Sequence, residues 1–376
     1  VIVKHDNLIF IHKLLKAIAD SIIIVFIPLY ILKETNDFKM SMAYLIIYSL
    51  FVMLFMFVFK KLIQKYGVIT MMVHFIPIIV AEGILSFVPI SIYSIIGVAA
   101  LMALNQAFYS IPLNLIFTFG DKKTNVGKFQ IASNIGKLVF TLVSGLILSS
   151  TIKNSFLILS ISSSIFYILC AIPLIFSYKE LKDNYIKYND NDSINIIKID
   201  PWFKIFHITF GLFQPIMDNV VPLYLYINYL SFQAVTIMIV IVEFMKILVN
   251  YLSQKLVSIK KEKLCVIIGF VLFIASLIGM VFVKNKVALY ILSCSCSISF
   301  PLTFVVMFRL YCNYLKETNN VFNGMTVRDF DIFLFRPLMY AISYTPLGFY
   351  PVFGVGFISC IIMLYSEIRL LKKLNK

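Results

Sequence analysis

Long apolar segments dominate the chain and recur at nearly regular intervals. Each is long enough to cross the ~30 Å hydrocarbon core of a bilayer, which takes roughly 20 helical residues. Because backbone polar groups in lipid must be paired within one segment, such runs predict helices rather than strands. The runs cover residues 8–32, 40–59, 68–88, 92–119, 129–150, 154–177, 203–227, 232–253, 264–283, 287–312, 328–347 and 351–371. The pattern therefore predicts an all-α membrane protein with twelve transmembrane helices.

One long polar stretch, residues 179–200, separates the first six runs from the last six. It is too hydrophilic to span, so we expect an N-terminal bundle at 1–178, a cytoplasmic linker, and a C-terminal bundle at 201–376. A shift of 194 residues lays one half on the other at two places: Pro28-Leu29-Tyr30 falls on Pro222-Leu223-Tyr224, and Lys61-Leu62 on Lys255-Leu256. The matches predict two pseudo-symmetric six-helix bundles, an arrangement that transporters use to enclose a central site.

Composition supports the membrane assignment. Hydrophobic residues make up 61% of the chain and charged residues 14%, against roughly 45–50% and 25% in soluble domains. The net charge of +15 would suggest nucleic acid in a soluble protein, but here it follows membrane topology. By this assignment one side of the membrane carries 22 Lys and Arg residues and the other only five, Lys33, Lys39, Lys153, Lys284 and Lys286. Positive loops stay in the cytoplasm, so both termini are expected there, in the cell membrane.

Prolines inside the apolar runs predict kinks, because each removes one backbone hydrogen bond. Those in question are Pro28, Pro77, Pro112, Pro215, Pro222 and Pro301. The six cysteines lie in or beside apolar runs and are interpreted as small hydrophobic residues rather than as a disulfide framework.

The chain resembles the major facilitator superfamily over essentially its whole length. The resemblance rests on the six-plus-six pattern, the linker and a basic loop between the second and third runs, KKLIQKYGVI, in which Lys65 and Gly67 match the family's loop signature. The segment containing Gly136 and Gly145 looks like a helix that packs through small residues. VRDFDIFLFR, at 327–336, looks like the charged start of helix eleven in some bacterial members. The resemblance implies gating by these loops, with Lys61, Lys65, Gly67, Arg328, Asp329 and Asp331 as candidate gating residues.

Ionisable side chains inside spans are costly and by default face the bundle interior. In the first run, Lys16 and Asp20 are four residues apart and share one helix face. Two interpretations are equally open: an internal ion pair that lets the helix insert, or a transport role. His12 and Lys13 lie nearer the cytoplasmic end and are expected to snorkel towards it.

The seventh run places Gln214 and Asp218 four residues apart. Asp218 lies near mid-span with no basic residue one turn away, so burial would favour its taking and releasing a proton. The alternative is that it only hydrogen-bonds a neighbouring helix. Under the shift of 194, Gln214 falls on Asp20, so both halves place a polar side chain at matching depth.

Other polar side chains inside the apolar runs are weaker candidates for the transport pathway. Glu243 stands one turn from Lys246 and would either pair with it or take part in transport. Arg336 could clamp an anionic substrate. Uncharged side chains such as Gln106 and Tyr109 would either form interhelical hydrogen bonds or contact the solute in a cavity and contribute to specificity. Glu82 is a further weak candidate.

The sequence thus predicts a secondary active transporter of a small solute, working by alternating access and coupled to protons through Asp218, Asp20 or Glu243. The alternative from another class is a transport-silent membrane scaffold or sensor that keeps the fold. No nucleotide-binding loop, zinc spacing or nucleophile motif appears, so we expect neither an enzyme nor a cofactor. The expected partners are the solute, protons and the lipid bilayer, with no nucleic acid, for a monomeric carrier.

Overall fold

Helices form all the regular structure of the described chain. The structure, a computed structural model, describes residues 2–119, 125–150, 152–189, 199–229, 231–258, 261–283, 285–318, 321–344 and 348–374. The N-terminal half contains α1 (Ile2–Ile23), η1 (Ile24–Phe26), α2 (Ile27–Thr35), α3 (Phe38–Val58), α4 (Lys60–Val73), α5 (Phe75–Phe87), α6 (Ile92–Phe119), α7 (Asn125–Ser149) and α8 (Ser155–Phe176), followed by α9 (Tyr178–Asn189). The C-terminal half contains α10 (Pro201–Pro215), η2 (Ile216–Val220), α11 (Val221–Tyr229), α12 (Phe232–Ser258), α13 (Glu262–Phe282), α14 (Lys286–Glu317), α15 (Val321–Leu334), α16 (Arg336–Ile342) and α17 (Tyr350–Leu374).

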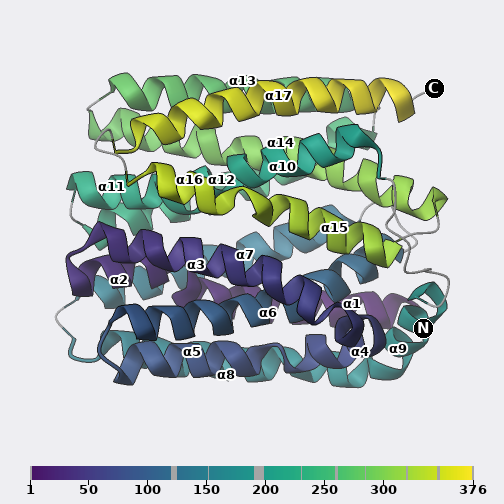
Figure 1. Ribbon diagram of the computed structural model, residues 1–376, viewed down its shortest axis with the longest axis horizontal. Helices are drawn as coiled ribbons and strands as arrows, with labels where there is room; N and C mark the ends of the chain where they lie inside the picture. Colours follow the sequence, from purple (N-terminus) through teal and green to yellow (C-terminus); the bar gives the residue numbers. More distant parts are fainter. Residues whose placement is uncertain are drawn as a thin grey trace.

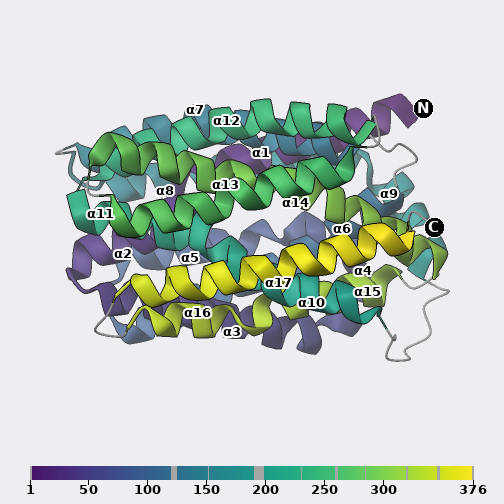
Figure 2. The same cartoon turned by 90° about the horizontal axis from the view of Figure 1, so that it is seen from above.

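Most of these helices are long and apolar enough to cross a membrane. Eight qualify among the described residues, and the pair α4–α5, bent by 50°, makes a ninth. Three further rods, α7, α10–η2–α11 and α15–α16, run along the bundle beside them (Figures 1 and 2). This arrangement is consistent with the twelve expected spans and confirms the all-α membrane fold.

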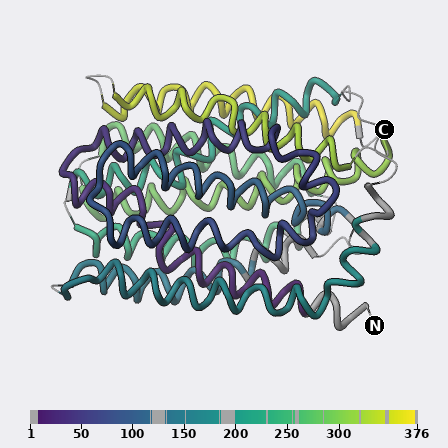
Figure 3. Tube along the Cα trace, turned by 60° about the horizontal axis from the view of Figure 1, so that its bottom comes forward, coloured from purple at the N-terminus to yellow at the C-terminus, as the bar shows by residue number. Residues whose placement is uncertain are grey.

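The rods lie roughly parallel in an elongated bundle. In Figure 1 the N-terminal half, purple to blue, occupies the lower part and the C-terminal half, green to yellow, the upper part. The beginning of α1 and the end of α17 lie at the same end of the bundle, as Figure 3 also shows. We call this the terminal end and the other the far end.

The largest contacts between the halves lie on two sides of the bundle. On one side α3 packs against α15 and α16, and on the other α7 packs against α12. Gly145 of α7 allows a close approach there, because a Cβ on it would lie 1.9 Å from Thr236 Oγ1. Gly136 of the same helix faces α1, with Ile18 and the Leu14 carbonyl at 3.2 Å from its ideal Cβ position. Both glycines therefore lie at tight helix crossings.

The polar segment expected as a linker begins as helix α9, which packs on α4, α6, α8 and α15 at the terminal end of the bundle. Residues 190–198 of this segment lie outside the described residues. Of the predicted kinks, those at Pro28, Pro215 and Pro222 coincide with breaks in helix geometry, whereas Pro112 and Pro301 lie inside continuous helices.

Candidate functional site

The first span of each half is interrupted near its middle. In the N-terminal half a short 3₁₀ turn, Ile24–Phe26, separates α1 from α2, and in the C-terminal half a π-helical turn, Ile216–Val220, separates α10 from α11. The shift of 194 residues carries 24–26 onto 218–220, so the two breaks are equivalent. Such local changes of helix type free backbone groups and frequently mark functional positions. Asp20 precedes the first break and Asp218 lies within the second.

In the N-terminal half, Asp20 is held by three hydrogen bonds. Lys16 Nζ lies 2.8 Å from Asp20 Oδ1 and 2.7 Å from Oδ2, and the Tyr167 hydroxyl donates to Oδ1 at 2.6 Å. The Lys16 ammonium also lies over the ring of Tyr109, 4.4 Å from its centroid. The ion pair anticipated at spacing four therefore forms, and two aromatic residues from α8 and α6 enclose it.

Two buried histidines lie behind this ion pair. His12 Nδ1 donates to the Cys170 carbonyl and His74 Nδ1 to the Met71 carbonyl, both at 2.7 Å, and the two rings flank Tyr109. The expectation that His12 snorkels is wrong, because its side chain is fully buried. A short imidazole cannot reach the membrane surface from this depth, and the Cys170 carbonyl supplies a partner inside the bundle.

Two other N-terminal candidates differ in their surroundings. Glu82 is buried and accepts hydrogen bonds from Ser163 at 2.8 Å and Ser164 at 3.3 Å, so it lies inside the bundle between α5 and α8. Gln106 is half-buried on α6, one turn from Tyr109.

In the C-terminal half, Gln214 connects two opposite charges. Its side-chain nitrogen donates to Asp218 Oδ2 at 2.9 Å, and its oxygen accepts from Arg336 Nη2 at 2.5 Å. Next to Asp218, the Asn219 side chain donates to the Tyr340 hydroxyl at 2.8 Å. Asp218 is exposed despite its mid-span position, and its electrostatic neighbours belong to α12, α14 and α16. The structure thus brings Arg336 to Gln214 and Asp218, although Arg336 and Gln214 lie 122 positions apart along the chain.

Glu243 and Lys246 form an ion pair on α12, with 3.0 Å between Oε1 and Nζ. Lys246 is also within electrostatic reach of Asp218. The pair therefore belongs to the same charged cluster as Asp218.

The charged clusters of the two halves approach each other at Tyr48 of α3. This tyrosine is within electrostatic reach of both Arg336 and Asp20, and its ring lies 6.1 Å from that of Phe333. Most of the side chains predicted to line the substrate or proton pathway therefore gather around one region in the middle of the bundle.

Near the terminal end, a second set of polar contacts joins the halves. Arg328 Nη1 pairs with Asp329 Oδ1 at 2.9 Å, and Ser110 of α6 donates to Asp329 Oδ2 at 2.8 Å. Asp331 is buried nearby, with Lys204 in electrostatic reach. Thr118 Oγ1 and Cys312 Sγ, which are 194 residues apart, lie 3.5 Å from each other. Thr118 and Cys312, which the shift of 194 residues lays on each other, therefore contact each other across the two halves.

The segment expected as a basic loop between the second and third spans is instead helical and forms the start of α4, which packs against the linker helix α9. A Cβ on Gly67 would lie 2.2 Å from the Tyr185 hydroxyl of α9, so a larger residue here would displace the Tyr185 side chain from its packed position. The same hydroxyl donates to the Ile63 carbonyl at 2.5 Å, beside the non-helical residue Tyr66. Lys61 and Lys65 are exposed there, with Lys65 lying over the Tyr66 ring at 5.0 Å.

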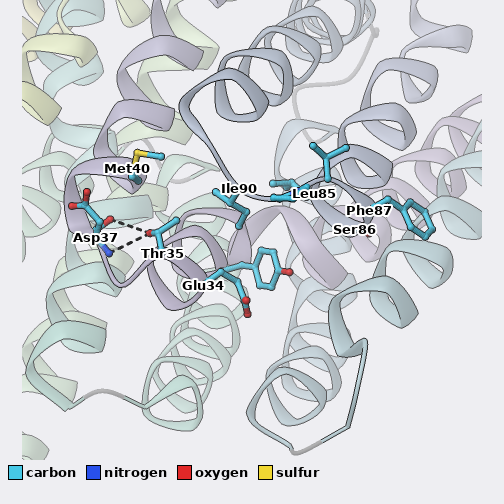
Figure 4. A pocket seen from close by; sticks show the side chains of 11 residues that line it. Glu34, Thr35, Asp37, Met40, Leu85, Ser86, Phe87 and Ile90 are labelled. Carbon is cyan, nitrogen blue, oxygen red and sulfur yellow. Dashed lines mark hydrogen bonds between the residues drawn. The ribbon is translucent and has the colours of Figure 1, made fainter.

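At the far end, other contacts join the halves. The Tyr344 hydroxyl donates to the Lys39 carbonyl at 2.6 Å, Phe38 packs edge-on against Phe349, and Lys33 lies over Phe232. A cavity of about 630 Å³ opens at this end (Figure 4), lined by Tyr30, Glu34, Asp37 and residues 85–90. It is built by the N-terminal half alone and is separate from the mid-span clusters.

Sequence reasoning did not find Tyr48, Ser110, Tyr167 or Tyr185 as partners of the candidate residues. With 21 tyrosines in the chain, a tyrosine inside a helix carries no signal that separates a hydrogen-bonding role from packing. Ser110 is equally inconspicuous, because its partner lies 219 residues away.

The arrangement defines a multi-pass membrane transporter. The family model of the Major Facilitator Superfamily matches residues 9–327, and the chain belongs to this family. Among solved structures, it resembles a bacterial homologue of the iron transporter ferroportin in the outward-facing state (12% identity, 98% of this chain and 99% of the other, TM-score 0.69). The same homologue with soaked iron gives 13% identity, 97% and 98% coverage, and a TM-score of 0.67. These likenesses concern the fold. A comparison with curated proteins gives no match.

Proposed function

We propose that this chain is a secondary active transporter that moves a small solute by alternating access, coupled to protons. The N-terminal bundle, residues 1–178, rocks against the C-terminal bundle, residues 201–376, with residues 179–200 as the linker. The observation that carries the proposal is the distribution of contacts between the halves. One set lies near the terminal end, around Ser110 and Asp329, and another at the far end, around Tyr344 and Lys39.

Between these two sets lie the mid-span charges. A contact set that opens at one end while the other stays closed exposes the centre to one side of the membrane at a time, which is the basis of alternating access. The π-helical turn around Asp218 and the 3₁₀ turn after Asp20 supply positions at which the central helices can bend.

Asp218 is the best candidate for the coupling proton. Asp20 accepts hydrogen bonds from Lys16 and Tyr167, and Glu243 pairs with Lys246, so adding a proton to either carboxylate would break an ion pair. Asp218 accepts only the Gln214 amide in the contacts described and is exposed. A carboxylate held this weakly takes a proton with the least loss of interaction.

A proteoliposome screen with an internal pH-sensitive dye tests the proposal. We expect one class of added solute to drive a change in internal pH, and Asp218→Asn to abolish solute accumulation while downhill exchange continues. Asp183→Asn, on the exposed surface of α9, is the matched control and should behave as the wild type. pH-driven accumulation that is unchanged in Asp218→Asn would remove this residue from the mechanism.

Two other outcomes would favour the alternatives. Solute exchange without any proton movement would indicate a uniporter that uses the same charges structurally. Absence of flux for every solute class would favour a transport-silent scaffold or sensor with this fold, which would have no need of the mid-span carboxylates.

The proposal includes a location in the cell membrane with both termini in the cytoplasm. The positive-inside distribution supports this orientation, and the placement of α1 and α17 at one end of the bundle agrees with an even number of spans. Labelling of single cysteines introduced near each terminus, by a reagent that cannot cross the membrane, should give signal only after permeabilisation.

A further inference from the structure

The Arg336 guanidinium is half-buried inside the α15–α16 span without an ion-pair partner among the described residues. Nη2 donates to Gln214, the cation lies over the Phe333 ring at 4.1 Å, and buried Nε has no hydrogen-bond partner. Among the described residues, no carboxylate lies within 4.0 Å of its nitrogens. An arginine in a span costs about 2.5–3.5 kcal/mol on insertion scales. Because this arginine has no ion-pair partner, its N–H donors are available for a ligand.

The neighbouring cations differ from Arg336 in this respect. Lys16 is paired with Asp20 at 2.7 Å and Lys246 with Glu243 at 3.0 Å. The carboxylate of Asp218, which could neutralise Arg336, is held away by Gln214, because the Gln214 amide accepts from one residue and donates to the other. Arg336 therefore keeps most of its five N–H donors unused.

The carboxylates that are coupled to Arg336, Asp218 and Asp329, lie beyond ion-pair distance of it among the described residues. Asp329 instead pairs with Arg328 at 2.9 Å and accepts a hydrogen bond from Ser110. In a region of low dielectric constant, a guanidinium without a paired carboxylate attracts anions.

We propose that the transported solute carries an acidic group, a carboxylate or a phosphate, which the free donors of Arg336 bind. The planar guanidinium presents paired N–H groups that match two oxygens of such a group. Tyr48 approaches Arg336 from the N-terminal half, so the bound anion contacts both bundles. This inference rests on the proposed transport function and specifies its substrate class.

The same geometry explains how the anion and a proton would be coupled. Asp218 lies within electrostatic reach of Arg336 and Lys246. When Asp218 is protonated, a negative charge that repels the anion disappears, so each ligand favours binding of the other. The solute is expected to move together with a proton in the same direction.

Thermal stabilisation of the purified full-length protein tests the substrate class. The probes are sodium succinate, sodium benzoate and sodium phosphate, with succinamide and benzamide as neutral analogues and manganese chloride as a divalent cation, at constant ionic strength. We expect at least one anion to raise the melting temperature of the wild type. Arg336→Gln should weaken its affinity about tenfold or more, Arg336→Lys should weaken it less, and Asp218→Asn should tighten it. Arg369→Gln, on the exposed face of α17, is the matched control and should bind as the wild type does.

The melting temperature of each variant without probe shows whether it is folded, and Arg336→Lys keeps the charge if Arg336→Gln is unstable. The inference is overturned if no anion stabilises the wild type, or if a neutral probe or manganese stabilises wild type and Arg336→Gln equally. Counterflow of the binding probe in liposomes separates this result from the transport function. Exchange of a neutral probe that does not depend on Arg336 would refute the acidic substrate class but support the transport function. Binding of an anion through Arg336 without exchange would refute the transport function alone.

Discussion

Gly211 of α10 crosses α15 so closely that any side chain is excluded. A Cβ at this position would lie 2.0 Å from the Ile332 carbonyl oxygen, 2.7 Å from its carbon and 3.0 Å from its Cα. All three are backbone atoms, so no change of rotamer relieves the contact, and the helices must separate by about 1 Å to reach even 3.0 Å. Overpacking of this kind costs about 1–3 kcal/mol, against a gain of about 0.5–1 kcal/mol when alanine replaces glycine in a helix.

Gly354→Ala in α17 is the control for Gly211→Ala, because nothing lies within 4 Å of the new Cβ there. Both variants gain the same helix propensity, so their difference isolates the close contact. We expect Gly211→Ala to melt several degrees below Gly354→Ala. A thiol-reactive fluorophore can report the unfolding, since Cys170, Cys265, Cys296, Cys312 and Cys360 are buried.

Gly211→Ala should also impair transport beyond its effect on stability. Gln214 lies one turn further along α10, and its 2.5 Å bond to Arg336 spans the two rods that the substitution pushes apart. Equal melting temperatures for Gly211→Ala and Gly354→Ala would refute the close helix crossing on which this reasoning depends.

Other parts of the structure give further predictions. Ser110→Ala removes a hydrogen bond to Asp329 between the halves, so it should favour the state open at the terminal end, measured as faster labelling of a cysteine placed there; unchanged labelling would exclude a gating role. Tyr185→Phe should loosen α9 by about 0.5–1.5 kcal/mol, the typical value of a hydrogen bond, seen as faster amide exchange in α9. Burial raises the pKa of Tyr185, so the undocked helix ionises first and docking weakens as pH rises above about 10. Tyr185→Phe should abolish that pH dependence, and its persistence in the variant would assign it to another group. Gly145→Leu should block closure of α7 on α12 and lower transport more than stability, measured as initial uptake rate against melting temperature.

Much of the fold could be predicted because it depends on local patterns. The apolar runs indicated the helices, and the match of Pro28 with Pro222 indicated the repeat that the breaks at 24–26 and 216–220 now show in backbone geometry. Most helix bounds differed by a few residues, since capping and local hydrogen bonds set the ends, but α4 and α15 begin at Lys60 and Val321, eight and seven residues before the predicted runs at 68 and 328. Pro112 and Pro301 were expected to kink their helices and do not break them, because tertiary packing decides whether a proline bends a helix in lipid.

The candidate site could be predicted only in part. The Lys16–Asp20 and Glu243–Lys246 pairs follow from helical spacing, because side chains three or four residues apart share a face. The contact of Arg336 with Gln214 could not be found this way, since the two residues are 122 positions apart. The expectation that His12 snorkels was wrong because it was based on the distance of His12 from the helix end. The sequence does not show its neighbours in α6 and α8, which bury the side chain.

The amino-acid sequence by itself determined that this protein is a helical multi-pass membrane protein with two related halves, since hydropathy and loop charge act segment by segment on insertion. Only the tertiary structure decided which polar side chains meet: Tyr167 with Asp20, Ser110 with Asp329, and Gln214 between Asp218 and Arg336. The physical reason is that helices in lipid are defined by backbone pairing within each segment, whereas their partners depend on close packing and hydrogen bonds between segments distant in the chain.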